Sequence, residues 1–383
     1  MSEIYLDNAA TTRMDPRVLE ALVGAYRLPL GNASSLHAPG VKAASQIELA
    51  RQRIARAIAA EPDEIFFTAS GTESNNWALI GACLANRDRG DHLIVSRIEH
   101  PSILAAAQWL STQKFRVTYA GVDSEGKIDL EELAASITDR TMLVSVMHAN
   151  NEVGVVQDIK AIGALCVQRG CLLHTDACQS FTKVPVHVRD QNIDLATLNA
   201  HKIHGPPGVA ALFVRKGTKI APFLHGGGQE AGLRSGTYNT EGIIGFGIAA
   251  QLAAEADNER MRSLRDGLIS DVLTRIPGTV LNGPRNQRLC NNVNFTFPAV
   301  SSKNLLFALN RAKIYVSIGS ACSAARKTPS HVLRAMGRDE VAAGESLRVS
   351  LSKWTTREEL TVFVKELERA VKRERRGGVR AGA

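Results

Sequence analysis

Between residues 45 and 250, short apolar runs alternate with stretches whose apolar residues recur at helical spacing. Parallel strands need a crossover between them, usually a helix, so this alternation predicts a mostly parallel sheet with helices on both faces. We therefore expect an α/β fold. The predicted strands are 64–68, 92–96, 116–120, 141–147, 171–175, 195–199 and 210–214, and the predicted helices are 45–60, 102–113, 130–137 and 159–169.

The last third of the chain has a different pattern. One long helical stretch, 249–276, precedes two short apolar runs at 291–297 and 347–351. This pattern indicates a smaller α+β domain. The first dozen residues are too few to fold alone and must pack on something else. We expect a large domain at 13–250 and a small domain made of 1–12 and 251–383.

The chain is basic, with 46 Lys and Arg against 38 Asp and Glu, a net charge of +8. Half of that excess lies in the last fourteen residues, which favours a solvated, frayed tail over a nucleic-acid site. Aromatic residues make up only 5% of the chain, too few to favour base stacking. We do not expect direct nucleic-acid binding. The tail cations are Lys372, Arg373, Arg375, Arg376 and Arg380, opposed by Glu374.

No apolar run reaches the roughly 20 residues that cross a bilayer, and the first residues do not resemble a signal peptide. A cytoplasmic enzyme that makes no membrane contact is expected. The six cysteines form no C-x-x-C pair, and the histidines complete no zinc spacing, so no metal site is expected. In a cytoplasmic protein these thiols stay reduced.

Two ionisable residues follow neighbouring predicted strands. Asp176 comes after the apolar run 171–175, and Lys202 lies in a His-Lys-Ile-His-Gly-Pro segment after 195–199. Alone, the aspartate reads as a turn cap and the lysine as a surface residue. Together, at the carboxyl edge of a parallel sheet, they suit pyridoxal phosphate chemistry: a Schiff-base lysine and a partner for the pyridine nitrogen.

Three further segments place polar residues after strands. Ser70-Gly71-Thr72 leads from a strand into a helix, whose first N–H groups favour a phosphate, although such a start is also an ordinary capped helix. His100 stands just before a helix, as a loop histidine or as a ring stacked on a cofactor and able to move protons. Asn151 follows the buried run 141–147 and offers an amide to a cofactor's phenolic oxygen.

With these motifs in one order, the chain resembles the cysteine desulfurases of the iron–sulfur cluster assembly and nitrogen fixation type. These are class V aminotransferase-like pyridoxal phosphate enzymes, of fold type I. The resemblance spans nearly the whole chain, from residue 5 to residue 351, and so many motifs in sequence are specific where one alone is not. The matching segments are 5–12, 34–37, 148–154, 176–179, 201–208, 226–237, 319–323 and 347–351.

The resemblance implies a role for each site residue. Lys202 would bond the cofactor covalently, Asp176 would pair with its pyridine nitrogen, and His100 would stack on its ring as an acid/base. Arg348 would clamp the substrate carboxylate, together with Asn151. The family is a homodimer. The remaining cofactor contacts would be Asn151 and Gln179 on the phenolic oxygen, and Gly71, Thr72, His201 and the second subunit's Thr237 on the phosphate.

Cys322 would be the decisive residue of such an enzyme. It lies among small residues, with Arg326 and Lys327 nearby to favour its thiolate. The resemblance implies that this thiolate attacks the sulfur of cofactor-bound L-cysteine. L-Alanine would be released, and a persulfide would be left on Cys322. A sulfur-acceptor protein for cluster assembly or for thiolation of a cofactor or nucleic acid would then take the sulfur. The structural alternative is a cysteine in a turn.

The chain departs from the family pattern at several positions. Ala33 replaces a usual proline, Asn199 replaces a usual serine near the phosphate, and 69–72 reads Ala-Ser-Gly-Thr rather than Ser-Gly-Ala-Thr. Two rival functions remain open. A class V aminotransferase or selenocysteine lyase would share Lys202 and Asp176 without needing Cys322 on every turnover. A sulfur-delivery protein with vestigial catalysis would lack a cofactor residue, and none is missing.

Overall fold

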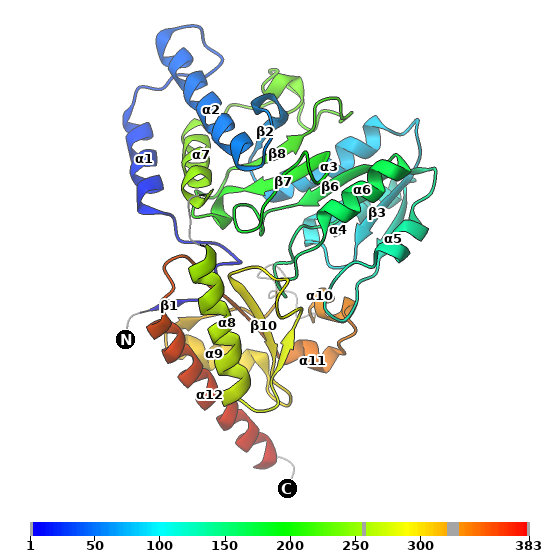
Figure 1. The fold of residues 1–383 in the computed structure, drawn as a ribbon. Helices are drawn as coiled ribbons and strands as arrows, with labels where there is room; N and C mark the ends of the chain where they lie inside the picture. The colour runs from blue at the N-terminus through cyan, green and yellow to red at the C-terminus, as the bar shows by residue number, and fades with distance from the viewer. Residues whose placement is uncertain (1–2, 255–257, 320–328, 381–383) are drawn as a thin grey trace.

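The computed structural model describes residues 3–254, 258–319 and 329–380. Figure 1 shows two lobes: a larger one built around a wide sheet, and a smaller one that holds both chain ends. Cys322, Arg326 and Lys327 lie outside the described residues. No helix in the described ranges is both long enough and apolar enough to cross a membrane.

A seven-stranded sheet forms the centre of the larger lobe, in the order β2-β8-β7-β6-β5-β3-β4. Only β8 runs antiparallel to its neighbours, β2 and β7. The expected mostly parallel α/β fold is therefore confirmed. The strands are β2 (Ile65–Thr68), β3 (His92–Ser96), β4 (Arg116–Ala120), β5 (Thr141–Ser145), β6 (Leu172–Asp176), β7 (Leu195–Asn199) and β8 (Ala210–Val214).

Helices cover both faces of this sheet, because successive strand residues point to opposite sides. Phe67 and Ile94 pack into one core cluster, whereas Phe66 and Leu93 pack into another. The first cluster lies under α1 (Pro16–Arg27), α2 (Ala38–Ala57), α5 (Leu130–Ser136), α6 (Ile159–Arg169) and α7 (Thr240–Ala254). The second lies under α3 (Gly71–Ala85) and α4 (Pro101–Thr112).

The smaller lobe has its own apolar core, which includes Ile4 and Leu6 from the start of the chain. The strand β1 (Ile4–Tyr5) pairs in parallel with β11 (Ile314–Tyr315). An antiparallel sheet, β9 (Val280–Asn282), β10 (Asn292–Thr296) and β12 (Ser346–Ser350), has β10 at its centre. Its helices are α8 (Asn258–Arg275), α9 (Ser302–Arg311), α10 (His331–Ala335), α11 (Glu340–Gly344) and α12 (Arg357–Arg380).

Two expectations for this region were wrong. The helix predicted at 249–276 begins too late, because α7 already starts at Thr240; α7 and α8 cover 249–254 and 258–275 of the predicted stretch, and 255–257 lie outside the described residues.

The basic tail is also helical rather than frayed, since α12 extends to Arg380. Val371 is fully buried against the smaller lobe's core and anchors this helix. Glu368 accepts from Arg275 and from Lys372, one turn further on, at 2.7 and 2.5 Å. Burial and i,i+4 pairing thus extend the helix into a segment whose composition alone favoured disorder.

Candidate active site

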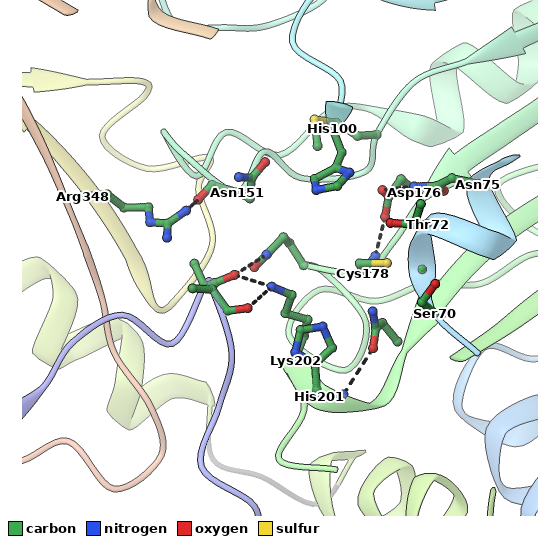
Figure 2. Close-up of a pocket in the computed structure, with 16 residues that line it drawn as sticks. Ser70, Thr72, Asn75, His100, Asn151, Asp176, Cys178, His201, Lys202 and Arg348 are labelled. Carbon is green, nitrogen blue, oxygen red and sulfur yellow. Dashed lines mark hydrogen bonds between the residues drawn. The ribbon is translucent and has the colours of Figure 1, made fainter. Parts of the chain in front are cut away.

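A cavity of about 230 Å³ lies between the carboxyl edge of the large sheet and the smaller lobe. Figure 2 shows side chains from several elements converging on it. Every expected site residue among those described lines it except Thr237, which is exposed on the larger lobe. The lining residues are Ala9, Ala10, Ser70, Gly71, Thr72, Asn75, His100, Met147, Asn151, Asp176, Cys178, Gln179, Asn199, His201, Lys202 and Arg348.

Lys202 ends a short 3₁₀ turn (Ala200–Lys202) that directly follows β7. Its Nζ donates to the carbonyl oxygen of Ala9 at 2.6 Å and to that of Ala10. Burial, and after it the positive charge of Arg348, lowers the pKa of Lys202 to about 8. A substantial fraction of the amine is therefore neutral near physiological pH, the form that can act as a nucleophile.

Asp176 is the last residue of β6 and is buried at the floor of the cavity. Its Oδ2 accepts from Asn75 Nδ2 at 2.7 Å, and its Oδ1 accepts from the backbone N–H of Cys178 at 2.9 Å. A carboxylate offers about four acceptor positions, so Asp176 retains acceptor capacity toward the cavity beside these two bonds. Because β6 and β7 are parallel, Asp176 and Lys202 reach the same edge of the sheet.

Asn75 is a site residue that the sequence reasoning missed. The two hydrogens of its Nδ2 bond Asp176 and, at 2.9 Å, the hydroxyl of Ser102. The signal was its helical spacing: Asn75 lies one turn after Gly71 on α3, so both face the cavity.

The N-terminus of α3 faces the cavity. Ser70 caps this helix, its hydroxyl accepting from the N–H of Glu73 at 3.1 Å. The N–H groups of Gly71 and Thr72 find no acceptor among the described residues, as expected for a first helical turn. A methyl group on Gly71 would lie 2.9 Å from Cys178 Sγ, so the backbone here leaves no room for a side chain. This cradle of free N–H groups suits a phosphate.

Two histidines border the cavity, and burial holds the pKa of each below its ordinary value. His100 caps α4: its Nδ1 accepts from the N–H of Ser102 at 3.2 Å and lies 2.8 Å from the Ser102 hydroxyl. The pKa of His201 falls to about 4, chiefly through burial and then through the neighbouring Lys202. Both rings are therefore neutral at physiological pH.

Arg348 comes from β12 in the smaller lobe and is 1% exposed. It bonds the Asp7 carboxylate at 2.7 Å and the carbonyl oxygen of Asn151 at 3.0 Å. Its Nε has no partner among the described residues. A guanidinium held in this way suits the carboxylate of a small ligand. Asp7, like Asn75, was not predicted as a site residue, because its partner is 341 positions away.

A lysine amine, an aspartate and a helix N-terminus at the carboxyl edge of a wide, mostly parallel sheet define the fold-type I class of α/β enzymes. The family model for class-V aminotransferases matches residues 4–363, and the chain belongs to that family. The resemblance noted from the motifs is thereby confirmed.

Individual relatives are similar over nearly the whole chain. A protein named cysteine desulfurase IscS from Clostridium botulinum is 44% identical, over 97% of this chain and 95% of the relative. The solved structure of a NifS-like protein superimposes with a TM-score of 0.91 at 38% identity, covering 97% of this chain and 100% of the other. A structure described as SspA in complex with cysteine superimposes with a TM-score of 0.82 at 34% identity, covering 93% of this chain and 100% of the other.

Proposed function

We propose that the chain is a pyridoxal phosphate-dependent cysteine desulfurase, which converts L-cysteine to L-alanine and keeps the sulfur as a persulfide on Cys322. One observation carries the proposal: a lysine amine of lowered pKa, an aspartate carboxylate and free helix N–H groups line a single cavity. The relatives named cysteine desulfurase and the relative described with bound cysteine support the substrate.

The cavity's residues fit the cofactor group by group. Lys202 would bond the cofactor covalently. Asp176 would accept a hydrogen bond from its pyridine nitrogen, since Asn75 and Cys178 leave acceptor positions free on the carboxylate. The cofactor, once bound, supplies an electron sink for the carbon skeleton of the substrate. The neutral amine of Lys202 is suited to take up and return a proton, since the pKa of that amine is about 8.

The phosphate would lie against the N–H groups of Gly71 and Thr72 and the ring of His201. Thr237 is exposed and lines no part of this cavity, so its phosphate contact would be made to the site of a second copy. Asn199, where the family usually has serine, lines the same end of the cavity.

His100, Asn151 and Gln179 would contact the ring and its phenolic oxygen. The Nε2 of His100 is the ring nitrogen left for proton transfer, because Nδ1 already accepts from Ser102. Gln179 directs its Nε2 to the carbonyl oxygen of Ala9 at 2.9 Å, which fixes the orientation of its amide.

Arg348 would bind the substrate carboxylate. In the sulfur-transfer step the Cys322 thiolate attacks the substrate sulfur, the carbon–sulfur bond breaks, and a proton returned to carbon completes L-alanine. L-Cysteine and one enzyme thiol thus become L-alanine and one persulfide, with no external oxidant.

A single-turnover reaction with L-cysteine tests the proposal. We expect one alanine per subunit and a mass increase of about 32 Da, one sulfur atom, mapped to Cys322. The Cys322→Ser variant loses both products. The control Cys83→Ala, which lies in the buried core away from the cavity, keeps both. Alanine without an adduct indicates a lyase that releases sulfur directly. Neither product from a cofactor-loaded protein refutes the proposal.

A homodimer is part of the proposal, and the outer face of α1 supports it. Leu19, Val23 and Tyr26 stand 52, 39 and 71% exposed at i, i+4 and i+7, a single apolar stripe. Nearby, Leu36 is 96% exposed. A second copy of the chain is the occupant that would also bring Thr237 to this chain's site.

The sulfur acceptor is proposed only by class: a protein that assembles iron–sulfur clusters or thiolates a cofactor or nucleic acid. The cytoplasmic location stays a prediction. We also propose the division into 13–250 and 1–12 with 251–383. The separate apolar cores support it, since Ile4 and Leu6 belong to the core of the smaller lobe.

A further inference from the structure

A second lysine lies behind Lys202, on the turn that follows β6. Lys183 Nζ donates to the carbonyl oxygen of Gln179 at 3.0 Å and to that of Lys202 at 3.1 Å. These two carbonyls belong to different connecting segments, one after β6 and one after β7. One amine therefore ties together the backbone of two residues that face the cavity.

Lys183 has no carboxylate partner among the residues that the structure describes. Salt bridges form around it, such as Arg265 with Asp266 at 2.7 Å, but none includes Lys183. A desolvated cation held only by carbonyl dipoles is costly, which makes it a candidate for a role beyond packing. Burial lowers the pKa of Lys183 to about 8, and its thiol neighbours Cys290 and Cys178 act in the opposite direction.

We propose that Lys183 is a positioning residue for Lys202: it fixes the turn that carries Lys202 and places a second positive charge beside the reactive amine. This inference deepens the proposed function and rests on it, because it assigns a role toward the lysine that would bond the cofactor.

The charges around Lys202 agree in sign with this role. Arg348 and Lys183 both lower the pKa of Lys202, whereas Cys178 and Asp7 raise it. A nearby cation is one of the recognised ways to keep a nucleophilic lysine neutral. Lys183 also lines two further cavities, and the other charged or titratable groups near it line them too. The first cavity has Lys127, Asp158, Arg262, Arg265, Asp266 and Arg288. The second has His204 and Lys353.

The test is the pH dependence of cofactor capture by the cofactor-free, full-length protein. Pyridoxal phosphate is added across a range of pH, and covalent capture by Lys202 is followed by absorbance. Replacing Lys183 by Met removes the charge and both hydrogen bonds, so the capture midpoint moves up by a fraction of a pH unit, since burial and Arg348 act more strongly on Lys202. That shift is about a twofold to threefold loss of neutral amine at neutral pH. Lys183→Arg, which keeps the charge, restores the midpoint.

Two comparisons keep the test decisive. Lys216→Met removes an exposed lysine on the same lobe and leaves the midpoint unchanged. If Lys183→Met does not fold, Lys183→Gln, which can still donate to carbonyls, carries the same expectation. A midpoint that stays in place, or a rate lowered by one factor at every pH, overturns the inference. Failure of the unchanged protein to capture pyridoxal phosphate at all would instead refute the proposed function.

Discussion

The crowding at Gly71 gives a prediction whose size follows from the structure. An ideal Cβ on this residue lies 2.9 Å from Cys178 Sγ and 3.1 Å from Asn199 Nδ2, so Gly71→Ala forces the ends of β6 and β7 away from α3. Overpacking of this kind costs about 1–3 kcal/mol. The gain of about 1 kcal/mol that alanine brings in a helix interior applies only in small part here, because Gly71 is the first residue of α3. We expect a net loss of about 1–2 kcal/mol in the free energy of unfolding.

Urea unfolding of the cofactor-free protein measures this loss, and two variants frame it. Gly267 lies inside α8 with nothing within 4 Å of its would-be Cβ, so Gly267→Ala should stabilise the protein. Adding Cys178→Ala to Gly71→Ala removes the nearer of the two obstructing atoms and should recover part of the stability. In the loaded protein, Gly71→Ala should also weaken pyridoxal phosphate binding. A Gly71→Ala protein as stable as the unchanged chain would refute the reasoning.

The remaining predictions concern the substrate, pH and assembly. A lysine at position 348 cannot form the two-pronged contacts of the Arg348 guanidinium with a carboxylate. Arg348→Lys should therefore raise the KM for L-cysteine about tenfold to a hundredfold in steady-state assays. An unchanged KM would contradict the assigned role. Burial raises the pKa of Glu99 to about 8, so the folded protein favours the protonated carboxyl. The stability that this group contributes is greatest at low pH and is lost as the pH rises from about 4.5 to 8. The Glu99→Gln variant keeps an acceptor for Ser96 and Met147 but does not titrate. Between about pH 4.5 and 8 its free energy of unfolding should therefore rise relative to that of the unchanged protein. A difference between the two proteins that stays constant with pH would contradict the prediction. Leu19→Asp combined with Tyr26→Asp should yield monomers by sedimentation, whereas Leu84→Asp, at an exposed position on α3, should not; an intact dimer would place the interface elsewhere.

The sequence predicted the larger lobe well because its signals are local. Apolar runs at 92–96, 116–120 and 195–199 coincide with β3, β4 and β7. β3 and β7 are buried throughout, and β4 is an edge strand; each is followed by a turn or helix signal. The convergence of Asp176 and Lys202 followed from strand direction alone. The helical tail depends on packing between distant segments, which periodicity does not record.

The sequence predicted the site residues themselves but not the side chains that hydrogen-bond to them and hold them in place. Asn75 supports Asp176 across 101 positions, and Lys183 reaches Lys202 across 19. Ser102 could have been suspected, since it follows His100 in the first turn of α4. The others use common side chains in ordinary contexts, and only tertiary geometry distinguishes them from surface residues.

The N-terminal segment that crosses from one lobe to the other has a consequence for synthesis of the chain. Ala9 and Ala10 leave the ribosome long before Lys202, yet their carbonyl oxygens hold its amine, and Asp7 holds Arg348. β1 has no partner until β11 has been made. A nascent chain can therefore build the wide sheet and still lack an organised site until its last strands emerge. The cavity around Lys202 and Arg348 is complete only after residues 4–10 have packed against β11 and β12.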